Sequence, residues 1–391
     1  MFTLTEEQEQ NIREIRRTLH RYPELAFQEQ KTAALIEYHL KKIGASYQTG
    51  LAGGTGIRAE LGKGSGPCVA LRADIDALPV AEETGLVFSS QQAGVMHACG
   101  HDGHTAMLLG AAQLLAQSPI LDELEARVVL LFQPAEEAGT GASAMIADNC
   151  LQDVSMIFCG HIDTHHPVGY FAVDQGLICS YTDPFTIDIY GQGGHAARPH
   201  EAIDAVVVGA SLVLNIQTMV SRIINPANPG VITVGRIAAG SVHNVIAGKA
   251  LLEGTIRSTH LDTRTLIIQK MQALVQGLEK MCSAEINFTL QQGLPAVVND
   301  ATSYTLARQA AEQLVGADRV ISHGLPSLGG EDFSFYQQKI PGTMVRFGAA
   351  KNPNPGPAHS SVFDFDEKVL AYGSRWLATV AVHALQHLKK S

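Results

Sequence analysis

The 391-residue sequence has little of several features that mark particular classes of protein. Charged residues are sparse at 17%, and basic residues are the minority, with 28 Lys and Arg against 38 Asp and Glu and a formal net charge of −10. An acidic chain lacks the basic surface that phosphate backbones and anionic lipids require. Uninterrupted apolar runs of roughly 18 residues, the length of a membrane span, are also missing. We therefore expect neither nucleic acid nor a membrane as a partner.

Cysteine is scarce as well, with six residues in 391. This number is too low for the disulfide framework of a small secreted protein. The first residues are acidic where a signal peptide needs a basic and then an apolar segment. Thr5 and Gln8 instead match a helix capping box, and Ile12, Ile15 and Leu19 follow at helical spacing. These observations predict a cytoplasmic protein.

Apolar residues make up 46% of the chain, enough to build the cores of two or three domains at this length. Tryptophan occurs once, whereas histidine occurs 16 times. Two short segments hold clusters of histidines, namely His97, His101 and His104, and His161, His165 and His166. Because histidine is the commonest metal ligand and a frequent proton carrier, these segments are candidates for a functional site.

Three apolar runs, 68–71, 127–132 and 154–158, are typical of buried parallel strands separated by helices. Polar residues follow each run: Asp74 and Asp76 the first, Glu136 and Glu137 the second, and His161 the third. In open α/β sheets, ligands bind beyond the carboxyl ends of the strands. We therefore expect these side chains to meet in one crevice.

Two further segments supply possible ligands. The segment 96–105 contains Cys99 and His101 and runs directly into a helical pattern over 106–116. The Pro- and Gly-rich loop 352–361 contains His359. A loop that enters a helix at the same edge of the sheet would add its cysteine and histidine to the crevice.

Imidazole, carboxylate and thiolate groups together form a donor set suited to zinc, manganese or cobalt. The candidates are too many for one ion, which favours two divalent ions that act on a hydrolytic water. Of the adjacent Glu136 and Glu137, one can bind metal while the other transfers a proton. Each residue alone has a simpler interpretation: a buried histidine, a solvated glutamate or a small buried cysteine. Their joint placement at strand ends favours the metal site.

The pattern changes after about residue 180. Strands are predicted at 185–190, 231–237, 249–257 and 285–290, with helices at 202–222 and 266–281. The order βαββαβ is that of a ferredoxin-like unit. We expect an α/β protein in which a mixed sheet with helices on both faces is built from 1–179 and 293–391, and in which 180–292 form an inserted α+β domain.

Five motifs carry a family resemblance: LRADIDALP at 71–79, HACGHDGHT at 97–105, FQPAEE at 132–137, GGHAARP at 193–199 and GGEDF at 329–333. With them the chain resembles the aminoacylase/carboxypeptidase metallopeptidase family over essentially its whole length. The similarity is to the amidohydrolase branch, which contains hippurate hydrolases, N-acyl-amino-acid amidohydrolases and plant auxin-conjugate hydrolases.

The resemblance implies five metal ligands, which are Cys99, His101, Glu137, His161 and His359. It also implies that Glu136 is the general base and that Asp76 orients a ligand. The wider family has a metal-binding His at the position of Asp74 and a bridging Asp near that of Cys99. The present chain shares its departures with the amidohydrolase branch, and they leave open the role of Asp74 and the identity of the metal.

The inserted domain resembles the family's dimerisation domain, which implies a homodimer or a larger assembly. His195 and Asn244 match residues that the family lends to the partner's active site, where His195 would stabilise an oxyanion. Arg257 would hold the substrate carboxylate with its planar guanidinium. The simpler interpretations are a loop histidine and a solvent-facing strand arginine.

The resemblance thus implies hydrolysis of the amide bond of N-acyl amino acids, small molecules of acetyl, benzoyl or aryl-acyl type, with two divalent ions (Zn, Mn or Co) per subunit. Two alternatives keep the same catalytic core: a deacetylase of an intermediate such as N-acetyl-diaminopimelate, and a hydrolase of aminobenzoyl-glutamate. A third is a metal-binding homologue without turnover.

Overall fold

The computed structural model describes residues 2–353 and 355–390, which form two compact units. The first unit comprises Met1–Ile178, Val298–Leu325 and Glu331–Ser391, and the second comprises Cys179–Val297 and Pro326–Gly330. The second unit therefore ends later than the expected 292. It also includes Pro326–Gly330, which we had expected in the first domain. Ser180 Oγ holds this segment by donating to the Leu328 carbonyl over 2.9 Å.

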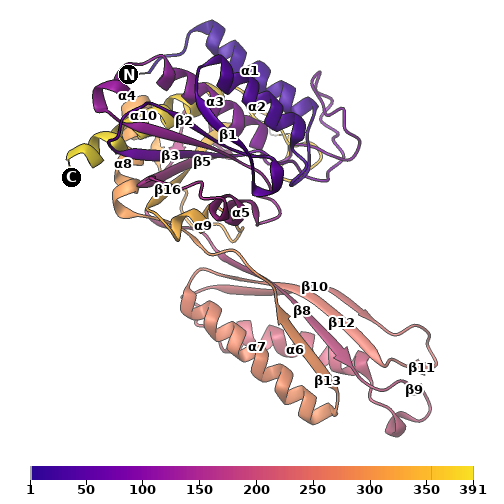
Figure 1. The fold of residues 1–391 in the computed structure, drawn as a ribbon. Coiled ribbons are helices and arrows are strands. Elements are labelled where there is room, and N and C mark those ends of the chain that lie inside the picture. The colour runs from indigo at the N-terminus through magenta and orange to yellow at the C-terminus, as the bar shows by residue number, and fades with distance from the viewer. Residues whose placement is uncertain (1, 354, 391) are drawn as a thin grey trace. The chain divides into compact units, whose positions relative to one another are not determined.

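The first unit is built on an eight-stranded mixed sheet (Figure 1). Its strand order is β1 (Ser46–Leu51), β2 (Gly56–Leu61), β4 (Arg127–Gln133), β3 (Cys68–Asp74), β5 (Met156–Pro167), β16 (Gly342–Ala350), β6 (Phe171–Ala172) and β15 (Val320–Ile321). The central strands β4, β3, β5 and β16 run parallel, and β1 and β2 pair antiparallel with their neighbours. Strand β6 pairs antiparallel with β16 and parallel with β15. The three apolar runs lie side by side as predicted, so their carboxyl ends share one edge.

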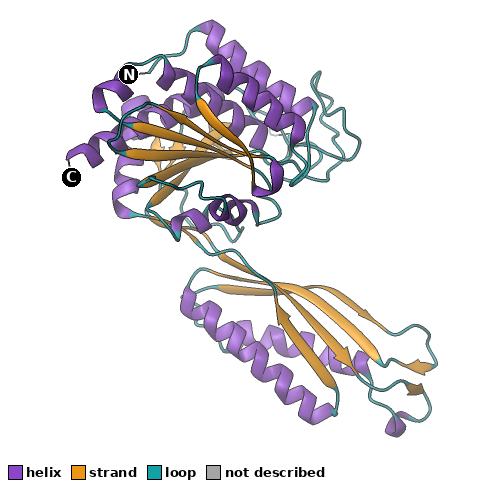
Figure 2. Cartoon of the chain, in the orientation of Figure 1, coloured by secondary structure: helices purple, strands orange, loops and turns teal. Residues whose placement is uncertain are grey.

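Helices cover the sheet, with α1, α2 and α3 on one side of it in Figure 2 and α5 and α9 on the other. The helices of this unit are α1 (Glu6–Arg21), α2 (Gln30–Lys42), α3 (His101–Ala116), α4 (Ile120–Leu124), α5 (Gly141–Ala147), α8 (Ala301–Val315), α9 (Ser334–Gln337) and α10 (Val369–Lys390). The capping box at α1 is confirmed, because Thr5 Oγ1 accepts from Gln8 N–H and Gln8 Oε1 from Thr5 N–H. The α/β class follows from this arrangement.

The predicted end of the third strand is wrong. The apolar run stops at Phe158, but β5 continues to Pro167. His161 therefore lies within the strand and not after its end. The reason is pairing: β16 runs parallel to β5 and stays in register with it from Ile157 through Asp163. Backbone hydrogen bonds therefore extend the strand where its side chains become polar.

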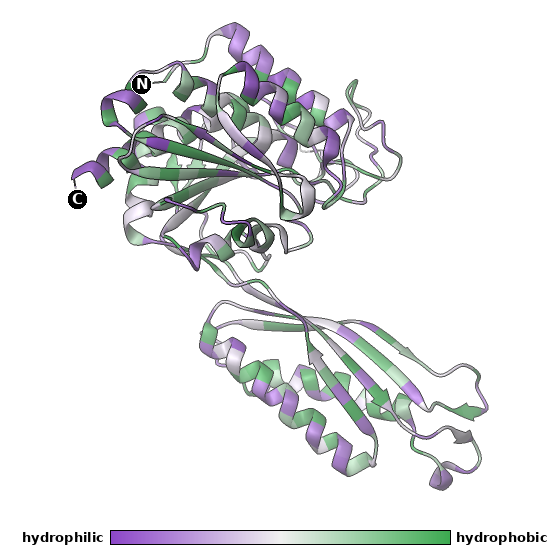
Figure 3. Cartoon of the chain, viewed as in Figure 1, coloured by the Kyte–Doolittle hydropathy of each residue, from purple (hydrophilic) through white to green (hydrophobic). Residues whose placement is uncertain are grey.

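The core of the first unit is apolar on the buried strands, which Figure 3 shows in green at the centre of the sheet. The single tryptophan, Trp376 of α10, is fully buried, and its indole N–H donates to the Ala307 carbonyl at 3.1 Å. Phe347 packs edge-on against this ring at 5.4 Å between centroids. This hydrogen bond satisfies the one polar atom of the indole, so burying the ring leaves no unsatisfied donor in the core.

A buried ionic cluster joins the two ends of the first unit. Arg16 of α1 is 1% exposed and donates to Asp102 at 3.0 Å, to Asp364 at 3.0 Å and to Glu367 at 3.2 Å. Burial alone would raise the pKa of Asp102, but the Arg16 guanidinium and the hydrogen bond with His20 together outweigh burial and keep that pKa well below its usual range. Removal of one partner would leave a buried charge uncompensated. Because Asp102 belongs to the first turn of α3, the cluster fixes the position of that turn.

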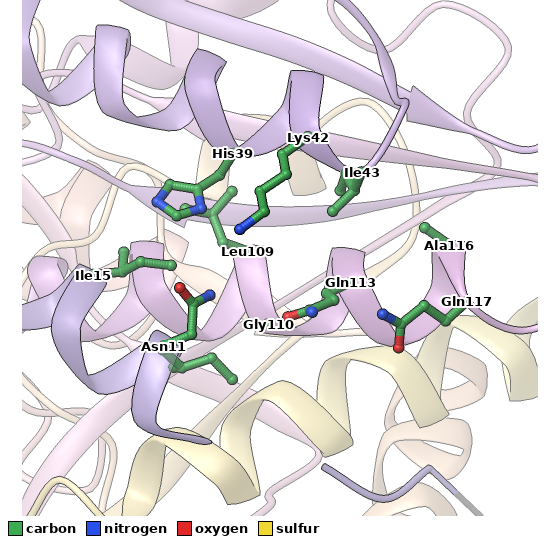
Figure 4. A pocket seen from close by; sticks show the side chains of 11 residues that line it. Asn11, Ile15, His39, Lys42, Ile43, Leu109, Gly110, Gln113, Ala116 and Gln117 are labelled. Carbon is green, nitrogen blue, oxygen red and sulfur yellow. The ribbon is translucent and has the colours of Figure 1, made fainter. Parts of the chain in front are cut away.

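A pocket of about 310 Å³ lies between α1, α2 and α3 (Figure 4). It is lined by the apolar Ile15 and Leu109 and by the polar Asn11, Lys42 and Gln113. None of the candidate metal ligands lines this pocket. The pocket is therefore separate from the candidate metal site.

The second unit has the βαββαβ order predicted for it. Its sheet order is β10 (Gly230–Ala239), β12 (Lys249–Ser258), β8 (Tyr181–Tyr190) and β13 (Glu285–Leu290), with every pair antiparallel. The helices α6 (Ala205–Arg222) and α7 (Leu261–Cys282) pack against this sheet. A small hairpin pairs β9 (Gly194–His195) with β11 (Val245–Ile246). The chain enters the second unit through β7 (Gly176–Cys179) and leaves it through β14 (Val297–Asn299).

Helix α6 is the one helix among the described residues with the length and composition of a membrane span. Its residues Val208, Leu212 and Ile216 are buried in the core of the second unit. Asp204 caps its first turn by accepting from the Val206 N–H at 2.9 Å. The apolar composition of α6 is thus accounted for in part by packing on the sheet.

Candidate metal centre

The carboxyl end of β3 holds Asp74, whose role the sequence left open. His104 Nδ1 lies 2.6 Å from Asp74 Oδ1, and Arg72 Nη1 lies 2.7 Å from Oδ2. The backbone N–H of Ile162 donates to His104 Nε2 at 2.9 Å, so Nδ1 carries the proton and donates to Asp74. Asp74 therefore positions His104, which the sequence places in a histidine cluster one helical turn after His101 without indicating its role.

Asp76 orients two of the predicted ligands. His101 Nδ1 faces its carbonyl at 3.0 Å and its Oδ1 at 3.2 Å, while Oδ2 accepts from the Glu137 N–H at 3.0 Å. The opposite nitrogen, His101 Nε2, is buried without a hydrogen-bond partner, 3.8 Å from Asp74 Oδ2 and 3.9 Å from Glu137 Oε1. An orphaned buried imidazole nitrogen beside two carboxylates is what a bound cation would satisfy.

Residues with left-handed backbone conformation precede two of the candidate site residues, His101 and Glu136. Gly100, with φ of 97°, precedes the first residue of α3, and a Cβ there would lie 3.3 Å from the Ile162 side chain. Ala135 has φ of 55° and turns the chain directly after β4, in front of Glu136. A non-glycine residue in this conformation is uncommon and concentrates at functional sites. Glu29 holds the turn by accepting from the Ala135 N–H at 3.1 Å.

Cys99 and His161 face each other, with Sγ 3.5 Å from Nε2. His161 Nδ1 lies 2.7 Å from the Ile162 carbonyl and so carries the proton, which leaves the Nε2 lone pair toward Cys99. Burial lowers the pKa of His161 to about 3, so this imidazole is neutral. Burial also raises the pKa of the Cys99 thiol to about 12, so a thiolate at neutral pH requires a cation beside it.

Glu137 and His359 complete the cluster, with Oε1 3.3 Å from Nε2. His359 lies on a loop with φ of 67°, and its N–H donates to the Ala98 carbonyl at 2.7 Å, which brings the loop next to Cys99. The five predicted ligands fall into two groups that share Cys99, and within each group the donor atoms lie within 4.8 Å of one another. These groups are Cys99, His101 and His161, and Cys99, Glu137 and His359. The donor set fits divalent transition ions.

Glu136 is 9% exposed and lies in an acidic, desolvated environment. Burial raises its pKa well above the usual value, and Glu331 and Asp332 raise it further. Arg72 holds both of these acids, with Nη2 3.1 Å from Glu331 and 2.9 Å from Asp332. The GGEDF motif supported the family resemblance, but no signal in the sequence placed it beside Glu136.

His195 and Asn244 lie together in the second unit. The Ala196 N–H donates to the Asn244 carbonyl at 3.2 Å, in the small hairpin where His195 pairs with Val245. His195 is exposed, and its Nδ1 accepts from the Ala197 N–H at 3.0 Å. The other ring nitrogen therefore carries the proton and is available as a donor.

Arg257 lies at the opposite end of the second unit's sheet. Its Nη1 donates to Thr182 Oγ1 at 3.0 Å and to the Leu328 carbonyl at 3.2 Å. The strand β12 runs from Lys249, near the small hairpin, to Arg257, and eight residues of strand span about 27 Å. Within one chain, Arg257 and His195 are thus not brought together.

The features described define a class of protein, the metal-dependent hydrolases. The family described as "Peptidase family M20/M25/M40" matches residues 70–383. An N-acetyl-L-cysteine deacetylase of Bacillus subtilis (strain 168) is 38% identical over 379 residues, 96% of this chain and 89% of that protein. The IAA-amino acid hydrolase ILR1-like 4 of Arabidopsis thaliana is 36% identical over 384 residues, 96% and 86% of the two chains.

Among solved structures, a Bacillus subtilis YXEP protein described as a dinuclear metal binding peptidase is 34% identical, with a TM-score of 0.86 over 98% of this chain and 99% of the other. The chain belongs to peptidase family M20/M25/M40 and is a metal-dependent amidohydrolase.

Proposed function

We propose that this protein hydrolyses the amide bond of N-acyl amino acids with two divalent ions, Zn, Mn or Co. The convergence of Cys99 with four other donor side chains, and with the buried Glu136 beside them, carries this proposal. When bound, such ions polarise the amide carbonyl and make water acidic at neutral pH. The similar deacetylase and IAA-amino acid hydrolase, named for substrates that are acylated amino acids, support the substrate class.

Glu136 acts as the proton carrier in this proposal. Its carboxylate takes a proton from the attacking water, and the resulting carboxylic acid returns that proton to the leaving amine. Both steps require a pKa near the working pH, and burial beside Glu331 and Asp332 raises the pKa of Glu136 in that direction. Asp76 and Asp74 hold the neighbouring imidazoles in orientation, so the donors are arranged before substrate arrives.

The second unit supplies the remaining contacts. Arg257 binds the free carboxylate of the amino acid, and His195 donates to the oxyanion that forms at the acyl carbon. An N-acyl amino acid is far shorter than the distance of about 27 Å along β12 that separates the two ends. If both residues act on one substrate, they come from different chains, with His195 and Asn244 acting in the partner's site.

A homodimer is therefore part of the proposal, and a cytoplasmic location fits the low number of cysteines. In the second unit, α6 and β10 expose large apolar side chains, with Val207 58%, Leu214 70% and Ile237 52% exposed. Apolar patches of this kind mark protein interfaces. We assign the dimer contact to these exposed side chains of α6 and β10.

Mixing two inactive variants tests the sharing of sites. Glu136→Ala and His195→Ala proteins each lack one function, and a mixed dimer contains one site with both residues intact. We expect equal mixing to restore up to about a quarter of wild-type turnover, since half the dimers are mixed and each has one complete site. Verified mixed dimers without any recovered activity would contradict sharing.

The substrate class is tested with a panel of N-acetyl, N-benzoyl and carbamoyl amino acids, N-acetyl-cysteine, IAA-amino acid conjugates, N-acetyl-diaminopimelate and aminobenzoyl-glutamate. We expect metal-dependent release of the free amino acid from simple N-acyl amino acids. Turnover confined to one of the last two compounds would favour a specialised enzyme. A protein that binds two ions but turns over nothing would be a metal-binding homologue.

A further inference from the structure

A second cluster of side chains of metal-ligating types lies in the first unit, separate from the candidate dinuclear site. It consists of Asp163 and His166, near the end of β5, and His323, just after β15. Asp163 Oδ2, His166 Nε2 and His323 Nδ1 all lie within 4.8 Å of one another. The cluster shares no residue with the five proposed ligands of the dinuclear site. We propose that Asp163, His166 and His323 form a separate binding site for one divalent transition ion of the Zn²⁺ type.

The first support is an unpartnered buried oxygen. Asp163 is 4% exposed. Its Oδ1 accepts from the His165 N–H at 2.8 Å and faces His165 Nδ1 at 2.7 Å, whereas Oδ2 has no hydrogen-bond partner. Leaving a carboxylate oxygen buried without a hydrogen bond is costly. A cation between Asp163 and the two histidines removes that cost.

The second support is the spacing of the donor atoms. His166 Nε2 lies 3.3 Å from His323 Nδ1, and His323 Nδ1 lies 3.5 Å from Asp163 Oδ2. With metal–ligand bonds of about 2.0–2.1 Å, neighbouring donors of a tetrahedral site lie roughly 3.3 Å apart. The two distances are thus close to the edges of a tetrahedral shell, with the fourth position left for water.

The third support is that the ligands are held and have the required charge. The Asp174 carboxylate accepts from the His323 N–H at 2.8 Å and also from the Ser322 hydroxyl, which fixes the loop after β15. The guanidinium of Arg346 lies 3.8 Å from Asp163 Oδ2, close enough to attract but too far to hydrogen-bond. Asp163 and Asp174 supply two negative charges, which offset part of the three positive charges of the divalent ion and Arg346.

Two imidazoles and one carboxylate suit zinc and its neighbours rather than calcium or magnesium, which prefer oxygen ligands. Such an ion would link the end of β5 to the segment after β15. His161 precedes Asp163 by only two residues, about 7 Å along a strand. A bound ion would therefore make β5 rigid next to the proposed catalytic ligands.

The test is the zinc content after equilibration with buffered Zn²⁺, measured by elemental analysis on the full-length protein. We expect His323→Ala and His166→Gln each to bind one equivalent less than wild type. The exposed His200→Ala, in the second unit, should bind as much as wild type. Circular dichroism and thermal melting confirm folding, and the half-buried His166 provides a second variant if His323→Ala is unstable.

The design separates this site from the proposed function. The difference between wild type and His323→Ala tests the new site, whereas the zinc that His323→Ala retains tests the dinuclear site. His101→Ala should show the reverse pattern, losing zinc at the dinuclear site while keeping the equivalent that His323→Ala loses. Equal zinc content in wild type, His323→Ala and His166→Gln would overturn the inference.

Discussion

Glu136→Gln is expected to lose at least about 100-fold in kcat while both metal ions stay bound. General acid–base catalysis contributes about 10²–10⁴-fold, and the amide of glutamine neither accepts nor returns the proton. The substitution keeps the size of the side chain, so the turn made by Ala135 and the buried surroundings of Glu136 persist. Steady-state kinetics on the preferred N-acyl amino acid, with elemental analysis of the same sample, measures both quantities.

The neighbouring Glu137→Gln is the matched control. Glu137 Oε1 is 3.3 Å from His359 Nε2 and belongs to a donor group with Cys99. We therefore expect this variant to lose metal as well as activity. If Glu136→Gln lost metal and Glu137→Gln kept it, the roles of the two glutamates would have to be exchanged. Near-normal turnover by Glu136→Gln would remove it as the proton carrier.

Cys99→Ser is expected to lower metal content and to reduce kcat/KM by about 100-fold or more. Cys99 is the only residue common to the two donor groups, so its loss weakens both ends of the cluster. A serine hydroxyl does not ionise at neutral pH as a metal-bound thiol does. Loss of Lewis-acid stabilisation amounts to several kcal/mol, and about 1.4 kcal/mol corresponds to tenfold in rate.

Cys150→Ser controls for the general effect of placing a hydroxyl at a buried cysteine. Cys150 is 0% exposed and belongs to none of the donor groups named above. This variant should be less stable than wild type but should retain its metal and its kcat/KM once folded. Equal metal content and activity in Cys99→Ser and wild type would show that the thiolate is not a ligand.

The sequence was sufficient to predict the parallel strands and the residues that gather at their ends. The signal is local there, because an apolar run followed directly by Asp74 and Asp76, or by Glu136 and Glu137, lies within about ten residues. Cys99 and His101 likewise stand next to the helix that positions them. Short-range patterns therefore gave the content of the candidate site.

What the sequence could not give depends on partners far along the chain. The length of β5 depends on its pairing with β16, whose first residue lies 186 positions after that of β5 (342 against 156). The apolar run that ends at Phe158 therefore does not indicate the full length of the strand. Arg72 forms ion pairs with Glu331 and Asp332 and so holds these acids near Glu136. No local sequence pattern indicates this proximity. The tautomer of His104 requires knowing that Ile162 donates to it.

The ionic cluster around Arg16 has a consequence for the synthesis of the protein. Arg16 lies near the start of the chain, and its partners Asp364 and Glu367 lie close to the other end. The ribosome therefore releases Asp102 and the first histidines long before Asp364, Glu367 and the nearby His359 exist. Until then Arg16 lacks two of its acids and the first turn of α3 is less firmly held. The proposed metal centre is therefore incomplete until the segment that carries His359 has been synthesised.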